Sequence, residues 1–196
     1  RVDKGRRAAL AEELEGLYDA REKKFLKGVG IKGFKCNSNY MRALIFEKHA
    51  TGKYAEFGRF NLPDPVDPAF YKDKEMTKIK VDVPALTLLL IDPTVPKELK
   101  DLIELYWDAE EVWKLRSTFV VSKHVTQGIG RDGRLRAGWN SCGTDTGRFS
   151  CSEPNLMNIP ASEDTPWANV RSMYIAAPGF TIIGADYSQL ELRVMY

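Results

Sequence analysis

An aspartate and a glutamate stand five residues apart near position 186, at the junction of two predicted elements. Thr181–Ile183 is a short apolar, mostly β-branched run after the turn signal Pro178–Gly179, which predicts a buried strand. A helical pattern then begins, with Ser188 as its cap. Asp186 would therefore follow the end of a strand, where a carboxylate suits a hard metal ion that prefers oxygen ligands. The alternative is that Asp186 only caps the helix and that Glu191 is a surface charge.

Two long motifs resemble the signatures of one enzyme family. Residues 186–193 read Asp-Tyr-Ser-Gln-Leu-Glu-Leu-Arg, and residues 146–160 read Thr-Gly-Arg-Phe-Ser-Cys-Ser-Glu-Pro-Asn-Leu-Met-Asn-Ile-Pro. Residues 186–193 resemble the first catalytic motif of family A DNA polymerases, the bacterial repair and phage replicative type. Residues 146–160 resemble the other long signature of the same family. The resemblance implies template-directed addition of deoxynucleotides to a primer 3′ end, by nucleotidyl transfer that uses two Mg²⁺ ions.

The resemblance also implies roles for the residues around the aspartate. Asp186 would be the catalytic carboxylate that binds both Mg²⁺ ions, and the backbone carbonyl of Tyr187 would be a second metal ligand. Ser188, Gln189 and Glu191 would line the pocket for the incoming deoxynucleoside triphosphate. The bulky Glu191 would leave no room for a ribose 2′-hydroxyl, which favours DNA synthesis over RNA synthesis.

The other motif implies contacts with the minor groove of primer–template DNA. Arg148 would donate to the acceptors that every correct base pair presents there. Asn155 and Asn158 would make similar polar contacts. Asparagines next to Pro154 and Pro160 also suit a turn, so both interpretations remain for them. The motif departs from the family pattern at several positions, among them Cys151, Met157 and Phe149.

Three further cations are candidates for DNA contacts. Lys114 and Arg116 end the longest predicted helix, where they would either neutralise backbone phosphates or complement the helix dipole. Arg171 is a candidate for a contact with the DNA backbone or with the triphosphate. A basic stretch over residues 21–35 has the same two interpretations, and we interpret it as a solvated helix end.

The elements that must position these residues are mostly helical in the first part of the chain. Apolar spacing and caps predict helices over about Lys4–Leu26, from Asn37 or Ser38 to about His49, and over Lys97–Val120. The pattern of residues 77–90 is ambiguous between a strand and a helix, and the resemblance favours a helix over about Val83–Leu90 with Asp82 as its cap. The inner face of the last helix should hold Leu99, Leu102, Ile103, Tyr106, Ala109, Val112 and Trp113.

Strands are expected only after this helical part. The Asp132–Gly133 pair predicts a hairpin whose strands run from about Val120 and over Leu135–Trp139. The expected fold is α+β: a helical, thumb-like region over residues 1–120, then the first strands of an antiparallel palm sheet in residues 121–196. The boundaries of these two regions follow the resemblance.

The resemblance covers only part of a polymerase. The fingers helix and the later His-Asp-Glu motif, which carries the second metal carboxylate, have no counterpart in the 196 residues. The expected partners are therefore the fingers and the rest of the palm, besides primer–template DNA and deoxynucleoside triphosphates. The alternative is a stand-alone or split-subunit DNA-binding module derived from such an enzyme.

Composition sets limits on these hypotheses. The formal net charge is +2, so a DNA-binding surface must come from local clusters of cations. The sequence has no apolar run that approaches the roughly 20 residues of a membrane span. Cys36, Cys142 and Cys151 are odd in number and lack metal-ligand spacing, which indicates reduced thiols in a cytoplasm.

Overall fold

The computed structural model describes residues 1–65, 70–72, 79–161, 168–185, 187–188 and 193–194. The chain divides into two compact units, of which one is residues 12–118 and the other combines residues 1–11 with residues 119–196. The helices are α1 (Lys4–Val29), α2 (Ser38–Ile45), α3 (Val83–Ile91), α4 (Lys97–Leu115) and α5 (Lys123–Gly128), and the strands are β1 (Gly138–Asn140) and β2 (Ser150–Ser152). Short 3₁₀ turns lie at Glu47–His49, Gly52–Phe57, Leu156–Asn158 and Val170–Met173.

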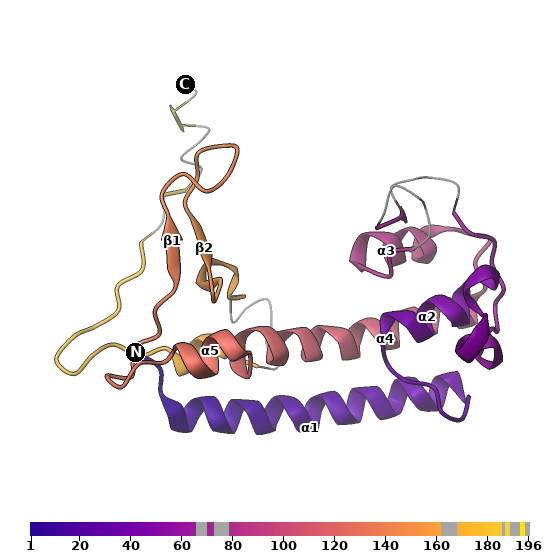
Figure 1. The fold of residues 1–196 in the computed structure, drawn as a ribbon, viewed down its shortest axis with the longest axis horizontal. Coiled ribbons are helices and arrows are strands. Elements are labelled where there is room, and N and C mark those ends of the chain that lie inside the picture. Colours follow the sequence, from indigo (N-terminus) through magenta and orange to yellow (C-terminus); the bar gives the residue numbers. More distant parts are fainter. Residues whose placement is uncertain (66–69, 73–78, 162–167, 186, 189–192, 195–196) are drawn as a thin grey trace. The chain divides into compact units, whose positions relative to one another are not determined.

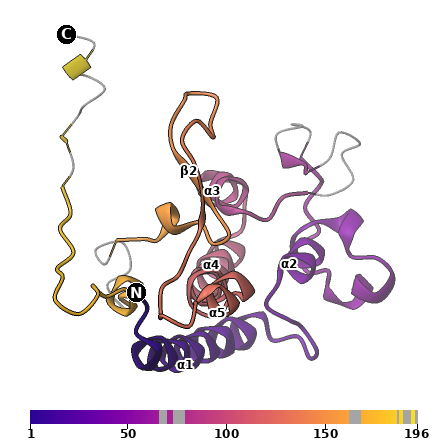
Figure 2. The same cartoon turned by 60° about the vertical axis from the view of Figure 1, so that its left-hand side comes forward.

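In the unit of residues 12–118, α1 and α4 run side by side, as Figures 1 and 2 both show. The pairing is antiparallel: Glu15 forms an ion pair with Arg116 at 3.1 Å, and Gly28 lies against Leu102 at the other end. A Cβ atom on Gly28 would stand 2.9 Å from Leu102 Cδ2, so the glycine allows the two helices to approach closely. Phe25 of α1 packs on Tyr106 of α4, with 5.6 Å between ring centroids.

The predicted caps of the short helices are confirmed. The Asn37 side chain accepts hydrogen bonds from the backbone N–H groups of Asn39 and Tyr40, which begins α2. The Asp82 carboxylate accepts from the N–H of Ala85 and begins α3. Gly30, with φ of +68°, follows the end of α1.

The predicted inner face of α4 is buried, except at Trp113. The buried side chains are Leu99, Leu102, Ile103, Tyr106, Ala109, Val112 and Leu115. Trp113 is 49% exposed, so its predicted burial is wrong. Each helical residue is rotated by about 100° from the one before it, so the stripe that passes through Val112 continues to Leu115 and leaves Trp113 outside.

The predicted strand from Val120 is also wrong. The chain continues from α4 as a π-helical segment, Arg116–Val120, and then forms α5. The Ser122 hydroxyl accepts from the N–H of Val125 and its carbonyl accepts from the N–H of Thr126, which is a helix start. This local cap favours a helix where the hairpin predicted around Asp132–Gly133 had indicated a strand.

The tight turn around Asp132–Gly133 is confirmed, because an antiparallel bridge joins Ile129 to Leu135. The strand predicted over Leu135–Trp139 lies further along the chain, since β1 begins at Gly138. It pairs with β2 in an antiparallel hairpin (Figure 1), in which Trp139 stands opposite Cys151. The described residues are thus mostly helical with one two-stranded antiparallel sheet.

Residues 181–183 do not form the predicted buried strand. They have no strand hydrogen bonds in the described part of the chain, and the Ile183 side chain is 87% exposed. A lone extended segment gains neither a hydrogen-bond ladder nor a covered face, so apolar composition by itself does not bury it. The helix predicted after Ser188 lies mainly outside the described residues. Arg193 and Val194 are described, and both are helical.

No helix in the described ranges is both long and apolar enough to cross a membrane.

Candidate nucleic-acid interface

The predicted metal and nucleotide residues fall largely outside the described ranges. Asp186, Gln189 and Glu191 belong to the residues that the structure does not describe. Tyr187 is 77% exposed, and Ser188 is exposed as well. Within the described residues, no group of three or more His, Cys, Asp or Glu side chains is placed to hold a metal ion. The metal ligands and the nucleotide pocket therefore remain predictions.

Arg148 lies on the loop that joins β1 to β2, and the backbone of that loop is held on both sides of it. Its N–H donates to Thr144 Oγ1 at 2.9 Å, and its carbonyl accepts from the N–H of Gly143 at 3.2 Å. Gly147 has φ of +73°, a conformation that favours glycine, and its N–H donates to the Thr144 carbonyl at 2.9 Å. The exposed Arg148 side chain thus stands on a turn that backbone hydrogen bonds close.

Cys151 organises the turn that carries the two candidate asparagines. Its side chain is 6% exposed, its thiol donates to the carbonyl of Pro154 at 3.4 Å, and its sulfur accepts from the N–H of Leu156 at 3.4 Å. Asn155 Oδ1 accepts from the N–H of Met157 at 3.1 Å, so Asn155 does serve the turn. The exposed Asn158 follows at the end of the same 3₁₀ turn.

The Arg171 side chain is engaged with the backbone of its own unit. Its Nε donates to the carbonyl of Pro160 at 3.0 Å, and Nη2 donates to the carbonyl of Ile159 at 3.1 Å. These bonds hold the 3₁₀ turn Val170–Met173 to residues 159–160, which directly follow Asn158. A contact of Arg171 with DNA or triphosphate would use its remaining N–H groups and stays a prediction.

In the other unit, Lys114 lines a cavity of about 430 Å³ at the end of α4. Asn37 and Ser38, at the start of α2, line the same cavity, and the sequence had indicated these two residues only as caps. Lys114 Nζ lies 4.0 Å from Glu110, and Arg116 is paired with Glu15 instead. Lys114 therefore shares one cavity with Asn37 and Ser38 and with the carboxylates of Asp82 and Glu110.

Two neutral groups form part of the wall of this cavity. Burial raises the pKa of the Cys36 thiol to about 12, and the nearby Glu110 and Glu22 carboxylates add to the rise. Burial likewise raises the pKa of Tyr106. Both groups are therefore protonated at pH 7, and neither is an anionic nucleophile in this cavity.

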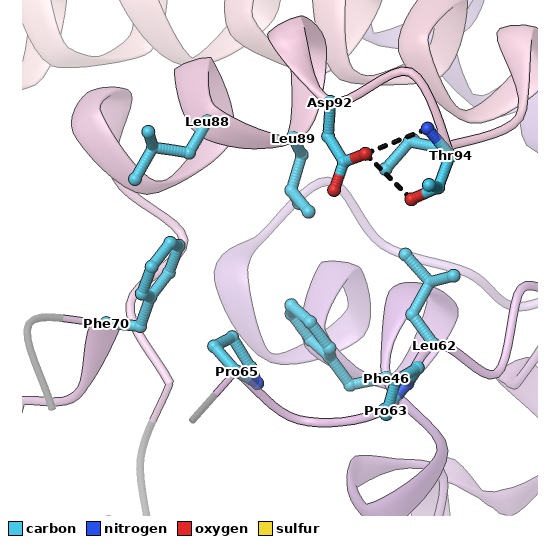
Figure 3. A pocket seen from close by; sticks show the side chains of 10 residues that line it. Phe46, Leu62, Pro63, Pro65, Phe70, Leu88, Leu89, Asp92 and Thr94 are labelled. Atoms are coloured by element: carbon cyan, nitrogen blue, oxygen red, sulfur yellow. Dashed lines mark hydrogen bonds between the residues drawn. The ribbon is translucent and has the colours of Figure 1, made fainter. Parts of the chain in front are cut away.

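A second pocket, of about 220 Å³, is mainly apolar (Figure 3). Phe46 and Leu62 form one wall and Leu88 and Leu89 of α3 form the other, while Asp92 at its edge bonds to Thr94. None of the predicted site residues within the described ranges lines it. The candidate interface is therefore not in this pocket.

A comparison with family models matches DNA polymerase family A over residues 9–196. Among curated proteins, the thermostable DNA polymerase I of Thermus filiformis is 40% identical over 97 residues, which cover 48% of this chain and 11% of the relative. The DNA polymerase I A, chloroplastic/mitochondrial, of Arabidopsis thaliana is 41% identical over 81 residues, 41% of this chain and 8% of the relative. A thermostable DNA polymerase I of Thermus thermophilus is 28% identical over 98% of this chain and 26% of its own length.

A solved structure has the same fold. The POL domain of Pol1 from M. smegmatis, in complex with DNA primer-template and dNTP, superposes with a TM-score of 0.67 at 23% identity. The match covers 99% of this chain and 30% of that chain. The present chain thus spans at most 30% of the length of each of these relatives.

Proposed function

The chain belongs to DNA polymerase family A, and we propose that it supplies the thumb-like region and the first part of the palm of a template-directed DNA polymerase. Residues 1–120 would be the thumb-like part and residues 121–196 the start of the palm. The observation that carries the proposal is the family match over residues 9–196, which includes both long motifs. The match to a polymerase domain solved with primer-template and dNTP supports it.

In this proposal, the hairpin and the turn behind it hold the primer end. Arg148 would donate to minor-groove acceptors, which are alike in all correct pairs, and so would sense pair geometry without reading sequence. Asn158 and the free amide N–H groups of Asn155 would add polar contacts. Lys114, which shares a cavity with Asn37 and Ser38, would bind the phosphate backbone.

Asp186 and the carbonyl of Tyr187 offer the hard oxygen donors that Mg²⁺ prefers. When bound, the metal would lower the barrier for attack of the primer 3′-hydroxyl on the α-phosphate by stabilising the developing charge. Glu191 would exclude a 2′-hydroxyl by its size, and Ser188 and Gln189 would shape the same pocket. These assignments follow the motif.

The test is Mg²⁺-dependent primer extension by the full-length protein. Asp186→Ala should abolish nucleotide addition while leaving primer–template affinity within about threefold of wild type, because its carboxylate acts on the reaction and not on the duplex. Ordinary extension rates in this variant would refute the metal assignment. Glu191→Ala should relax discrimination against ribonucleotides, and unchanged sugar selectivity would count against the proposed gate. A wild-type protein that binds DNA without extending a primer would instead favour the stand-alone binding module.

A further inference from the structure

Four guanidinium groups gather on the tight turn between α5 and β1. Arg131, Arg134 and Arg136 lie within six residues of one another, and all three are exposed. Arg1 joins them from the other end of the sequence, since its Nε donates to the Asp132 carbonyl at 3.1 Å. No role in the proposed site involves any of these four arginines.

Backbone hydrogen bonds hold this turn in place. The N–H of Gly130 donates to the carbonyl of Arg134 at 2.9 Å, which closes the turn. The N–H of Val2 donates to the carbonyl of Gly133 at 2.8 Å, which ties the segment carrying Arg1 to it. A Cβ atom on Gly133 would lie 3.4 Å from Arg1 Nε, so the guanidinium of Arg1 covers the turn itself. The cluster is therefore built by tertiary structure and is not only a run of charge in the sequence.

One carboxylate shares this turn with the four cations. Asp132 binds Arg136 through both oxygens, at 3.2 and 2.7 Å, and also accepts from the N–H of Arg134. These bonds lower the pKa of Asp132 to about 2, so it is ionised at neutral pH and orients the Arg136 side chain. Even so, the side chains of Arg134 and Arg136 are 62% and 63% exposed. Four arginines and one aspartate leave an excess of three positive charges, against +2 for the whole chain.

We propose that this arginine turn, consisting of Arg1, Arg131, Arg134 and Arg136, binds the phosphodiester backbone of the primer–template at a place separate from the Arg148 contact. The inference rests on the proposed function. A guanidinium presents paired N–H donors that match two phosphate oxygens, and four of them on a fixed turn suit a polyanion. Arginine is also less strongly hydrated than lysine, so less hydration is lost when it binds.

The hairpin sets the spacing between the two contacts. β1 runs from the arginine turn towards the loop of Arg148, and at about 3.3 Å per residue the two ends lie roughly 15–20 Å apart. This distance corresponds to about five phosphates along one strand. The arginine turn would therefore contact DNA about five nucleotides from the primer end, on either the duplex or the template overhang.

The experiment measures primer–template affinity of the full-length protein as a function of salt. Arg131→Gln combined with Arg134→Gln should weaken binding about tenfold at low salt and lower the slope of log K against log salt by about two, one unit per lost phosphate contact. Arg131→Lys with Arg134→Lys keeps the charge and should retain most of the affinity. Lys97→Gln with Lys100→Gln, in the other unit, is the control with an equal loss of charge and should leave the slope unchanged.

Two outcomes would overturn the inference, and a third would overturn the proposed function on which it rests. An unchanged affinity and slope in the double glutamine variant, while Arg148→Ala weakens binding, would overturn the inference and leave the proposed function intact. An equal loss in the Lys97 and Lys100 control would also overturn it, since the effect would then be one of overall charge. A wild-type protein without affinity for primer–template would mean that the proposed function itself fails. If the effect of the double variant vanishes on a shortened duplex, the contact is with the duplex, and if it vanishes on a shortened overhang, the contact is with the template strand.

Discussion

Replacing Cys151 with alanine should loosen the turn that carries the candidate asparagines. The substitution removes the acceptor of the Leu156 N–H and the donor to the Pro154 carbonyl, both at 3.4 Å. An N–H left without its partner costs about 1 kcal/mol, and the small cavity left by one sulfur atom adds about 0.5 kcal/mol. We therefore expect a loss of about 1–2 kcal/mol in the local stability of this turn.

Amide hydrogen exchange at Leu156 measures this loss directly. A change of about 1.4 kcal/mol corresponds to a tenfold faster exchange, if the turn opens locally. Cys151→Ser is the matched control, because a hydroxyl can accept and donate at the same position. Because Asn155 and Asn158 stand on this turn, primer–template affinity should fall in the alanine variant and be kept in the serine variant.

Two results would refute this reasoning. Equal Leu156 exchange in wild type and in Cys151→Ala would show that the sulfur contacts contribute nothing. A serine variant that exchanges as fast as the alanine variant would show that packing of the sulfur, and not its hydrogen bonds, holds the turn.

Three further predictions concern the unit of residues 12–118. Lys114→Gln should lower the salt slope of primer–template binding by about one, and an unchanged slope would remove Lys114 from the interface. Asp82→Ala should lower the free energy of unfolding, measured in urea, by about 1 kcal/mol, because the N–H of Ala85 loses its cap. Asp82→Asn should leave this free energy nearly unchanged. Burial lowers the pKa of His49 below its ordinary value of 6.5, despite Asp64 at 4.0 Å. The unfolded chain then binds more protons below pH 6.5, so stability should fall as pH drops through that value, and His49→Gln should flatten this dependence.

The helices could be predicted because their signals are local. Asn37 caps α2 through backbone groups two or three residues away, and the apolar stripe of α4 repeats over the whole helix. The Asp82 cap of α3 is local as well, but the resemblance was needed to favour a helix there, because the pattern of residues 77–90 was ambiguous. Such signals depend on neighbours in sequence, and tertiary structure only has to agree with them.

The errors arose where local signals compete or where burial depends on another segment. At residues 120–128, the cap at Ser122 outweighs the strand that the Asp132–Gly133 turn had indicated, and a helix forms. The exposed Ile183 shows the second case, because a β-branched run becomes a buried strand only when a partner strand covers it.

The residues of the candidate interface could be predicted from the motif, but their contacts could not. The motif named Arg148 and the asparagines, but the turn hydrogen bonds of Cys151 and the backbone contacts of Arg171 depend on how the chain folds back. The arginine turn escaped the sequence argument because Arg1 is more than a hundred residues from its neighbours in the fold.

The unit that contains the arginine turn combines two distant segments, residues 1–11 and residues 119–196, and this affects the order of folding. Val2 pairs with Tyr174, and the N–H of Asp3 donates to the carbonyl of Met173, so this unit closes only after the segment around Tyr174, about 170 residues beyond Val2, has left the ribosome. Residues 12–118 form one continuous segment, so this unit can fold before the segment around Tyr174 is synthesised. Contacts between distant residues form slowly because a long loop must close first. During synthesis, the helical unit should therefore fold first, and Val2 and Asp3 should stay unpaired until the segment around Tyr174 emerges.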